Sequence, residues 1–278
     1  MEAPKLRRHA GGAGIKGRER KVQNLFSVAG TVVLVTGGAR GIGAMIAEGF
    51  LRTGAAKVYI TARKAAECEA AAERLGAIGP CVAVSADLST REGIEAVASR
   101  IEADGAGLDV LVNNAGAVWA EPFEQLGEAA WDKVMNINVK APFFLTQRLH
   151  SLLKARASAE APARVIIVGS IDGLHCPPLE TYPYSASKAA VHHLTRTLAA
   201  RLASDHILVN CIAPGPFESK MMAATLAALG DQIKQASPLK RIGRPDDVAG
   251  AAIFLASRAS AFVTGAVIPV DGGISTTL

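Results

Sequence analysis

Short apolar runs rich in β-branched residues alternate with longer helical patterns through most of this 278-residue chain. The runs that predict strands are residues 32–35, 57–62, 81–85, 108–112, 164–169, 207–212 and 266–270. The stretches with helical spacing are residues 44–51, 64–75, 90–104, 124–153, 184–204 and 245–257. Strands joined through helices need right-handed crossovers, so the sequence predicts α/β architecture. We expect a single doubly wound Rossmann domain with a seven-stranded parallel sheet.

A glycine-rich turn follows the first predicted strand. Residues 36–43 read Thr-Gly-Gly-Ala-Arg-Gly-Ile-Gly and lead directly into a helical pattern. Glycine allows a tight turn and close backbone approach, and the N-terminus of a helix attracts phosphate. The spacing differs from the common Gly-x-Gly-x-x-Gly pattern. The turn predicts a binding site for the pyrophosphate of a dinucleotide, formed by Gly37, Arg40, Gly41, Ile42 and Gly43.

Tyr184 and Lys188 are four residues apart in a predicted helix, so their side chains share one face. A nearby ammonium group favours ionisation of a phenol and lowers its pKa. Tyr184 would then exchange a proton near neutral pH, which the interconversion of an alcohol and a ketone requires. Taken alone, this spacing is typical of two solvated neighbours on an exposed helix.

Several motifs together resemble the short-chain dehydrogenase/reductase family over about residues 30–275. They are Thr-Gly-x-x-x-Gly-x-Gly at 36–43, Asn-Asn-Ala-Gly at 113–116, a serine at 170 that ends a strand, Tyr-x-x-x-Lys at 184–188 and Pro-Gly at 214–215. The resemblance implies a Rossmann-fold oxidoreductase with a nicotinamide cofactor. It also implies a homotetramer in which the helices at 124–153 and 184–204 pair across two-fold axes.

The resemblance assigns four catalytic positions. Tyr184 would protonate the developing alkoxide during reduction, and Ser170 would donate a hydrogen bond to the substrate oxygen. Lys188 would lower the pKa of Tyr184 and contact the nicotinamide ribose. Asn138 matches the asparagine that holds a water linking Lys188 to solvent, with Asn136 as the alternative assignment.

Further cofactor contacts follow from the same resemblance. Asp87 and Leu88 would contact the adenine, and Asp87 is also a candidate N-cap of the next helix. The loop at 113–116 would border the adenosine and ribose, and the residues after the sixth strand would shape the nicotinamide pocket. These positions are Asn113, Asn114, Ala115, Gly116, Pro214 and Gly215.

The choice of cofactor is indicated by charge. Sites for NAD place a carboxylate after the second strand, whereas the 2′-phosphate of NADP needs a cation. Here that strand ends Thr-Ala-Arg-Lys at 61–64, with no carboxylate. The planar guanidinium groups of Arg63 and Arg40 suit a phosphate clamp. The sequence therefore predicts NADPH/NADP.

Composition excludes other classes of protein. Half of the residues are apolar, yet no apolar run approaches the roughly 18–20 residues that cross a bilayer. We expect a soluble, cytoplasmic protein without membrane contact.

The cysteines and histidines do not indicate a metal site. The four cysteines, at 68, 81, 176 and 211, lack metal-ligand spacing and predict reduced thiols. The histidines at 192 and 193 are adjacent, which does not fit a metal site either.

The net charge of +5 lies in the first 24 residues, which hold seven Lys and Arg against two Glu. A basic segment without hydrophobic periodicity predicts a disordered tail over residues 1–26, ahead of a domain at 27–278. A solvated tail is favoured over a contact with nucleic acid or an acidic partner.

Substrate identity is expected to depend on the loops at 171–183 and 216–243. His175 and Cys176 lie in the first and are candidate substrate contacts. The second predicts a lid with a Met-rich apolar surface, which adapts to flexible aliphatic groups. It also holds Lys220, Lys234, Lys240 and Arg241, which would either meet an acidic carrier or phosphate or form a solvated basic edge.

Residues 213–221 and 158–166 are similar to rhamnolipid-type NADPH-dependent 3-oxoacyl-[acyl-carrier-protein] reductases. That narrower resemblance implies a ketone substrate carried as a 3-oxoacyl thioester, with acyl-carrier protein as a partner. Two alternatives stay open. One is a dehydrogenase or reductase of another small molecule, such as a sugar or polyol; the other is an NADPH sensor or scaffold without turnover.

Overall fold

A seven-stranded parallel sheet forms the centre of the computed structural model, which describes residues 25–105, 107–177, 179–219 and 222–277. Its strands lie in the order β3-β2-β1-β4-β5-β6-β7. They are β1 Val32–Val35, β2 Lys57–Ala62, β3 Cys81–Ser85, β4 Val110–Asn113, β5 Ala163–Val168, β6 Ile207–Pro214 and β7 Val267–Val270. The predicted fold class is confirmed. Of the tail predicted at 1–26, residues 1–24 lie outside the described residues.

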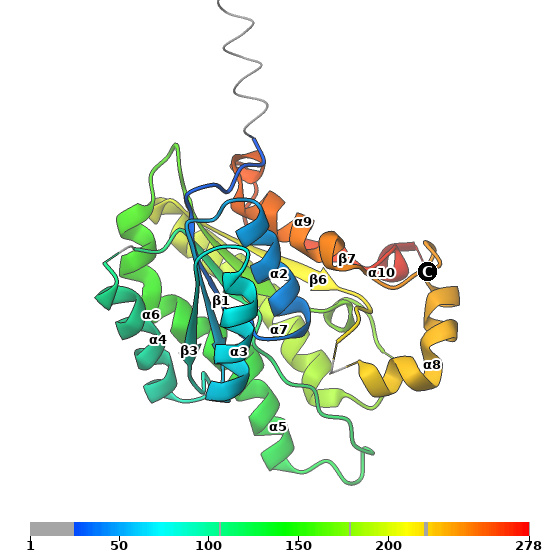
Figure 1. Ribbon diagram of the computed structural model, residues 1–278. Helices are drawn as coiled ribbons and strands as arrows, with labels where there is room; N and C mark the ends of the chain where they lie inside the picture. The colour runs from blue at the N-terminus through cyan, green and yellow to red at the C-terminus, as the bar shows by residue number, and fades with distance from the viewer. Residues whose placement is uncertain (1–24, 106, 178, 220–221, 278) are drawn as a thin grey trace, which may run out of the picture.

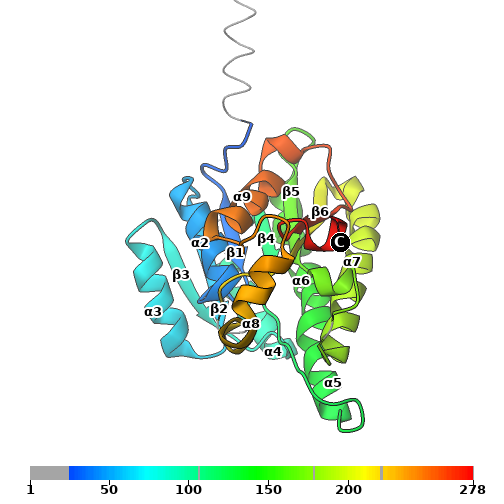
Figure 2. The ribbon, with the colours of Figure 1, turned by 90° about the vertical axis from the view of Figure 1, so that its right-hand side faces the viewer.

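Helices cover both faces of the sheet (Figure 1, Figure 2). One face carries α2 Gly41–Arg52, α3 Ala65–Gly76 and α9 Pro245–Ala256, and the other carries α4 Arg91–Ala103, α6 Ala141–Arg156 and α7 Tyr182–Leu202. Each face has its own buried apolar cluster. The strand order reverses between β1 and β4, and in doubly wound sheets ligands bind beyond the strand ends at such a reversal.

The long helix predicted at 124–153 differs from the structure at its start and in its middle. It begins as α5 Glu128–Met135, continues through a π-helical segment, η1 Asn136–Lys140, and then becomes α6. Residues 123–125 form a turn, and Gly127 is the N-cap of α5 with extended backbone. The hydrophobic pattern alone does not reveal a π segment, which often occurs at functional sites.

The 216–243 segment leaves the body and carries α8 Ala223–Ala236, which projects outward in Figure 1. Its two ends are fastened together. Phe217 is 1% exposed and bridges Gly243, whose N–H donates to the carbonyl of Pro216 at 2.9 Å. A Cβ at Gly243 would lie 2.3 Å from the Phe217 ring, so only glycine fits there. The two ends of the 216–243 segment are therefore held together by this contact.

Short elements complete the described chain: η2 Ile171–Gly173, η3 Ala203–Asp205, η4 Arg258–Ser260 and α10 Ile274–Thr277. Across the described ranges, every helix is too short or too polar to cross a membrane.

A buried arginine fastens α9 to the sheet. Arg164 on β5 is 3% exposed, and its guanidinium donates to the carbonyls of Leu255 and Ser257 at 3.1 Å each and of Pro162 at 2.5 Å. Burial lowers its pKa to about 10. The cation thus satisfies carbonyls at the C-terminal end of α9, where positive charge is favoured.

We predict that Arg164→Ala lowers the free energy of unfolding by about 3 kcal/mol, because buried carbonyls lose their donors. Urea unfolding at neutral pH measures the loss. The matched control is Arg201→Ala, since that side chain is 69% exposed and pairs with Asp205 at 3.4 Å; its loss should stay below about 1 kcal/mol. Equal losses in the two variants would contradict the role of Arg164.

Candidate active site

The glycine-rich turn is joined to the loop after β4 by a small set of hydrogen bonds. Thr36 Oγ1 accepts from the N–H groups of Asn114 and Ala115 at 2.9 Å each. Asn114 Nδ2 donates to the carbonyl of Thr36 at 2.8 Å and of Gly37 at 3.3 Å. A Cβ at Gly43 would lie 2.4 Å from that same Nδ2 atom. The close contact explains why glycine is needed at Gly43.

The start of α2 is open to an anion. Its N-cap residue, Arg40, has extended backbone and makes no side-chain capping bond, and Gly41 adopts a φ of 54°. The first N–H groups of a helix need an acceptor from outside the helix. A phosphate supplies one, so the turn fits the pyrophosphate of a dinucleotide. Gly37, Ile42 and Gly43 complete the turn that sequence reasoning selected.

Ser170, Tyr184 and Lys188 meet beyond the end of β5. Ser170 follows the strand directly, and its side chain lies close enough to the phenol of Tyr184 to lower the pKa of that phenol. Lys188 Nζ donates to the carbonyl of Val168 at 2.8 Å and lies 5.4 Å from the centre of the Tyr184 ring. The structure therefore brings together the three residues that the sequence predicted as a unit.

The pKa of Tyr184 differs from the sequence expectation. Burial raises it to about 12, the charge of Asp172 also raises it, and the hydrogen bond from Ser170 only partly opposes them. Burial lowers the pKa of Lys188 to about 8. The expected net lowering of the tyrosine pKa is not found in this structure, because burial outweighs the groups that favour ionisation of the phenol. Tyr184 holds its proton at neutral pH.

Asn138 is the buried residue of the π segment. Its Nδ2 donates to the carbonyl of Ala117 and to Ser187 Oγ, both at 2.9 Å, and its Oδ1 accepts from the N–H of Ala117 at 2.8 Å. Asn138 thereby ties the loop after β4 to α7. Asn136, the alternative assignment, is only partly buried.

The remaining predicted positions line the same strand ends. A Cβ at Gly116 would lie 3.0 Å from Asn138 Oδ1, so this part of the loop passes close to Asn138. Pro214 is buried at the end of β6, and the N–H of Gly215 donates to Val270 at 3.1 Å. Asn113 lies apart from them, since its buried side chain donates to Thr146 Oγ1 of α6 at 3.2 Å.

Asp87 is exposed beside the buried Leu88. Its carboxylate accepts from the N–H of Ser89 at 3.0 Å and from Ser89 Oγ at 2.7 Å, and the second of these bonds contributes most to lowering its pKa. The expectation that Asp87 caps the next helix is wrong. Thr90 is the N-cap of α4 and accepts from the N–H of Gly93 at 3.0 Å, because a turn separates Asp87 from the helix.

Arg40 and Arg63, the two arginines that the sequence predicts as a phosphate clamp, are both exposed. The charge of Arg63 acts on Asp87, and Arg40 pairs with Glu67 at 3.4 Å. Glu67 also pairs with Lys64 at 3.1 Å. Sequence reasoning missed this carboxylate, although its position three residues after Lys64 was a visible signal.

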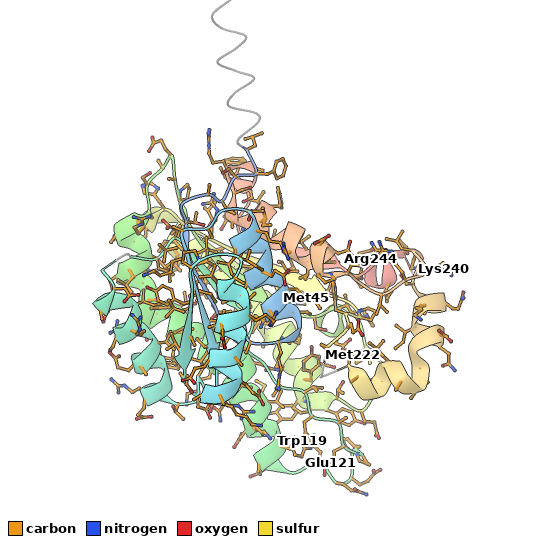
Figure 3. The ribbon with its side chains drawn as sticks, viewed as in Figure 1. Met45, Trp119, Glu121, Met222, Lys240 and Arg244 are labelled. Carbon is orange, nitrogen blue, oxygen red and sulfur yellow. The ribbon has the colours of Figure 1, made fainter. Side chains whose placement is uncertain are left out.

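The 216–243 segment passes close to the glycine-rich turn, because a Cβ at Gly41 would lie 3.3 Å from Ser219 Cβ. In the view of Figure 3, Met222 lies toward Met45 of α2, whereas Lys240 lies at the outer end of the segment. Lys220 and Met221, both assigned to the predicted lid, are outside the described residues.

The basic side chains of the 216–243 segment are largely engaged within the chain. Arg241 binds Asp247 at 2.5 Å and 3.0 Å, and Lys234 pairs with Asp231 at 3.2 Å. Lys240 Nζ donates to the carbonyl of Gln235 at 2.6 Å. An acidic carrier would therefore compete with these internal contacts.

In the part of the chain that the structure describes, no three His, Cys, Asp or Glu side chains are arranged to hold a metal ion. The cysteines are free thiols: Cys68 and Cys211 are buried, Cys81 is partly buried and Cys176 is exposed.

Comparisons with known proteins agree with this geometry. A family model described as enoyl-(acyl carrier protein) reductase matches residues 37–275. The rhamnolipids biosynthesis 3-oxoacyl-[acyl-carrier-protein] reductase of Pseudomonas aeruginosa is 47% identical over 251 residues, which cover 89% of this chain and 97% of that protein. The chain belongs to the short-chain dehydrogenase/reductase family. It is an oxidoreductase by that membership.

Other members of the short-chain dehydrogenase/reductase family widen the comparison. The solved Pseudomonas aeruginosa RhlG/NADP active-site complex matches with a TM-score of 0.87 and 46% identity, covering 91% of this chain and 99% of that one. The 5-keto-D-gluconate 5-reductase of Escherichia coli is 37% identical over 256 residues, 91% of this chain and 98% of that protein. The family resemblance that the sequence predicted is confirmed, including its rhamnolipid-type branch.

His192 of α7 lies directly behind this site, against the backbone of Gly169 and Gly173. It is 3% exposed, and among the described residues neither ring nitrogen has a hydrogen-bond partner. Burial lowers its pKa to about 4, and the charges of Lys188 and Arg196 act in the same direction, while the backbone of Gly173 opposes them. The imidazole is therefore neutral at neutral pH.

We predict that His192 makes the fold sensitive to acid. Its pKa is lower in the folded chain than the unperturbed value of about 6.5, so the unfolded chain binds the extra proton and stability falls as pH drops from about 6.5 toward 4. The contribution is about 3 kcal/mol. Urea unfolding of His192→Leu should show a smaller loss between pH 7 and pH 4 than wild type, whereas the exposed control His193→Leu should match wild type. An unchanged loss in His192→Leu would contradict the assignment.

Proposed function

We propose that this chain is an NADPH-dependent reductase that converts a ketone to a secondary alcohol. The observation that carries the proposal is the meeting of Ser170, Tyr184 and Lys188 at the end of β5. Tyr184 holds its proton at neutral pH and donates it to the developing alkoxide, while Ser170 donates a hydrogen bond to the same oxygen. A phenol that stays protonated suits reduction better than oxidation.

NADPH is the proposed hydride donor. Gly37, Gly41 and Gly43 form the turn against its pyrophosphate, and Arg40 and Arg63 bind the 2′-phosphate. Asp87, Leu88 and the loop at 113–116 border the adenosine half. Pro214 and Gly215 shape the nicotinamide pocket, where Lys188 exchanges its bond to Val168 for one to the ribose. The NADP complexes of similar proteins support this choice.

The proposed substrate is a 3-oxoacyl thioester carried on acyl-carrier protein or CoA. Support comes from the 47% identical reductase of rhamnolipid synthesis. The 216–243 segment, fastened at Phe217 and Gly243, is proposed as the lid over the acyl chain. A homotetramer and a cytoplasmic location remain predictions from the family.

Reduction of a keto-sugar is the second candidate. Several similar proteins act on sugar acids by name, among them the 5-keto-D-gluconate 5-reductase of Escherichia coli and a gluconate 5-dehydrogenase of Burkholderia cenocepacia solved with NADP and tartrate. Asp172, two residues after Ser170, is partly buried and its charge acts on Tyr184; a carboxylate near the reacting groups suits a polyhydroxy substrate better than an aliphatic chain.

The deciding assay follows NADPH oxidation by absorbance with acetoacetyl-CoA and with 5-keto-D-gluconate, and repeats both with NADH. We expect kcat/KM for the thioester to exceed that for the keto-sugar at least about tenfold, and NADPH to be preferred. Arg63→Ala should narrow the preference for NADPH without changing turnover at saturating cofactor. If only the keto-sugar is reduced, the substrate is a keto-sugar and not a 3-oxoacyl thioester. Tight NADPH binding without any turnover would instead indicate a sensor.

A further inference from the structure

Two turns that border the proposed cofactor site are fastened together at the end of β2. The N–H of Gly37 donates to Thr61 Oγ1 at 3.2 Å, and the N–H of Gly38 donates to the carbonyl of Thr61 at 3.1 Å. A Cβ at Gly38 would lie 2.7 Å from a side chain of β2, so the glycine-rich turn packs directly on this strand. The turn that carries Arg40 and the turn that carries Lys64 therefore lie side by side.

The carboxylate of Glu67 holds a cation from each of these turns. Its Oε1 lies 3.1 Å from Lys64 Nζ, and its Oε2 accepts from Arg40 Nη1 at 3.4 Å. Glu67 is in the first turn of α3, three residues after the N-cap Lys64. A phosphate is bound by the same kinds of group, because its oxygens also accept from ammonium and guanidinium donors. The chain thus already holds an anion where the two turns meet.

The 2′-phosphate of NADP is proposed to bind at this same place. In dinucleotide-binding domains the residues after the second strand contact the ribose 2′ position, with a carboxylate for NAD and an arginine for NADP. Arg63 directly follows β2, whereas Glu67 is further along, in α3. A phosphate bound at Arg40 and Arg63 would therefore have the Glu67 carboxylate as a neighbour, and like charges at that range repel.

A purely structural role for Glu67 would be confined to α3. An acidic residue in the first turn of a helix is favoured by the helix dipole, and Lys64 and Glu67 are close as residues three apart. The contact with Arg40 instead reaches a residue 27 positions away. Arg40 makes no side-chain capping bond to its own helix, α2. Helix stability does not explain the contact between the two turns.

We propose that Glu67 is a specificity-determining residue that competes with the 2′-phosphate for Arg40 and Lys64 and so limits the preference for NADPH over NADH. This inference rests on the proposed placement of the 2′-phosphate at Arg40 and Arg63. When NADPH binds, Arg40 and Lys64 exchange the carboxylate for the phosphate, and Glu67 stays near enough to repel it. NADH has a hydroxyl at that position and leaves both ion pairs intact.

The experiment measures the Kd of NADPH and of NADH from nicotinamide fluorescence, without ketone, in wild type, Glu67→Gln and Glu69→Gln. Glutamine also suits the third position of a helix, so the first change removes the charge and keeps the local structure. Glu69 is exposed in the same helix, and its loss changes the net charge equally. Residues two apart in a helix do not share a face, so Glu69 is the matched control.

We expect Glu67→Gln to bind NADPH about fivefold more tightly than wild type, with the Kd for NADH changed less than about twofold. Glu69→Gln should match wild type within about twofold for both cofactors, because a more distant exposed charge is screened. In about 1 M KCl the gain of Glu67→Gln should shrink below about twofold, since the Debye length is then only about 3 Å.

Three results would overturn the role of Glu67. An NADPH affinity that Glu67→Gln leaves unchanged would show that its contact with Arg40 is incidental. An equal gain in Glu69→Gln, or a gain that persists at high salt, would show an effect other than this local charge. Weaker binding of NADH by Glu67→Gln would show that the carboxylate accepts from the ribose of that cofactor.

The comparison of the two cofactors separates this inference from the proposed function. If wild type prefers NADPH and Glu67→Gln binds it no more tightly, the inference fails and the proposed cofactor stands. If wild type binds both cofactors equally and Glu67→Gln prefers NADPH, the inference stands and the proposed preference of the natural protein fails.

Discussion

The hydrogen bonds between Thr36 and the loop after β4 are the contact on which the rest of the site depends. β1 and β4 are neighbours only because the chain crosses to the other side of β1 after β3. Thr36 Oγ1 and Asn114 Nδ2 join the two strand ends at that reversal and fix the glycine-rich turn above them. The loop then continues to Asn138, which carries the connection on to α7.

The site separates binding from proton chemistry. The turn at 36–43 opens the start of α2 to a phosphate, while Ser170 and α7 hold the reacting groups in a drier environment. That dryness raises the pKa of Tyr184 and lowers that of Lys188. The same burial keeps His192 neutral behind the site. Burial thus determines which of these side chains carries a proton at neutral pH.

The features that could be predicted from the sequence are those set by the spacing of residues along the chain. The bounds of β2 and β3 are those that the β-branched runs predict, and the spacing of Tyr184 and Lys188 places both on one helix face. The π segment around Asn138 and the pKa of Tyr184 were not predictable, because they depend on segments distant in sequence. Asp172 was visible two residues after Ser170, but only the structure shows that burial raises the pKa of its carboxyl.

The most direct test of the account compares wild type with Tyr184→Phe, measuring ketone-dependent NADPH oxidation and NADPH binding on the same samples. Phenylalanine keeps the ring that lies beside Lys188 and removes only the proton donor. The account predicts a loss in kcat of at least about 100-fold, with the Kd for NADPH changed less than about threefold. Turnover within a few-fold of wild type would show that Tyr184 is not the acid and would contradict the central claim.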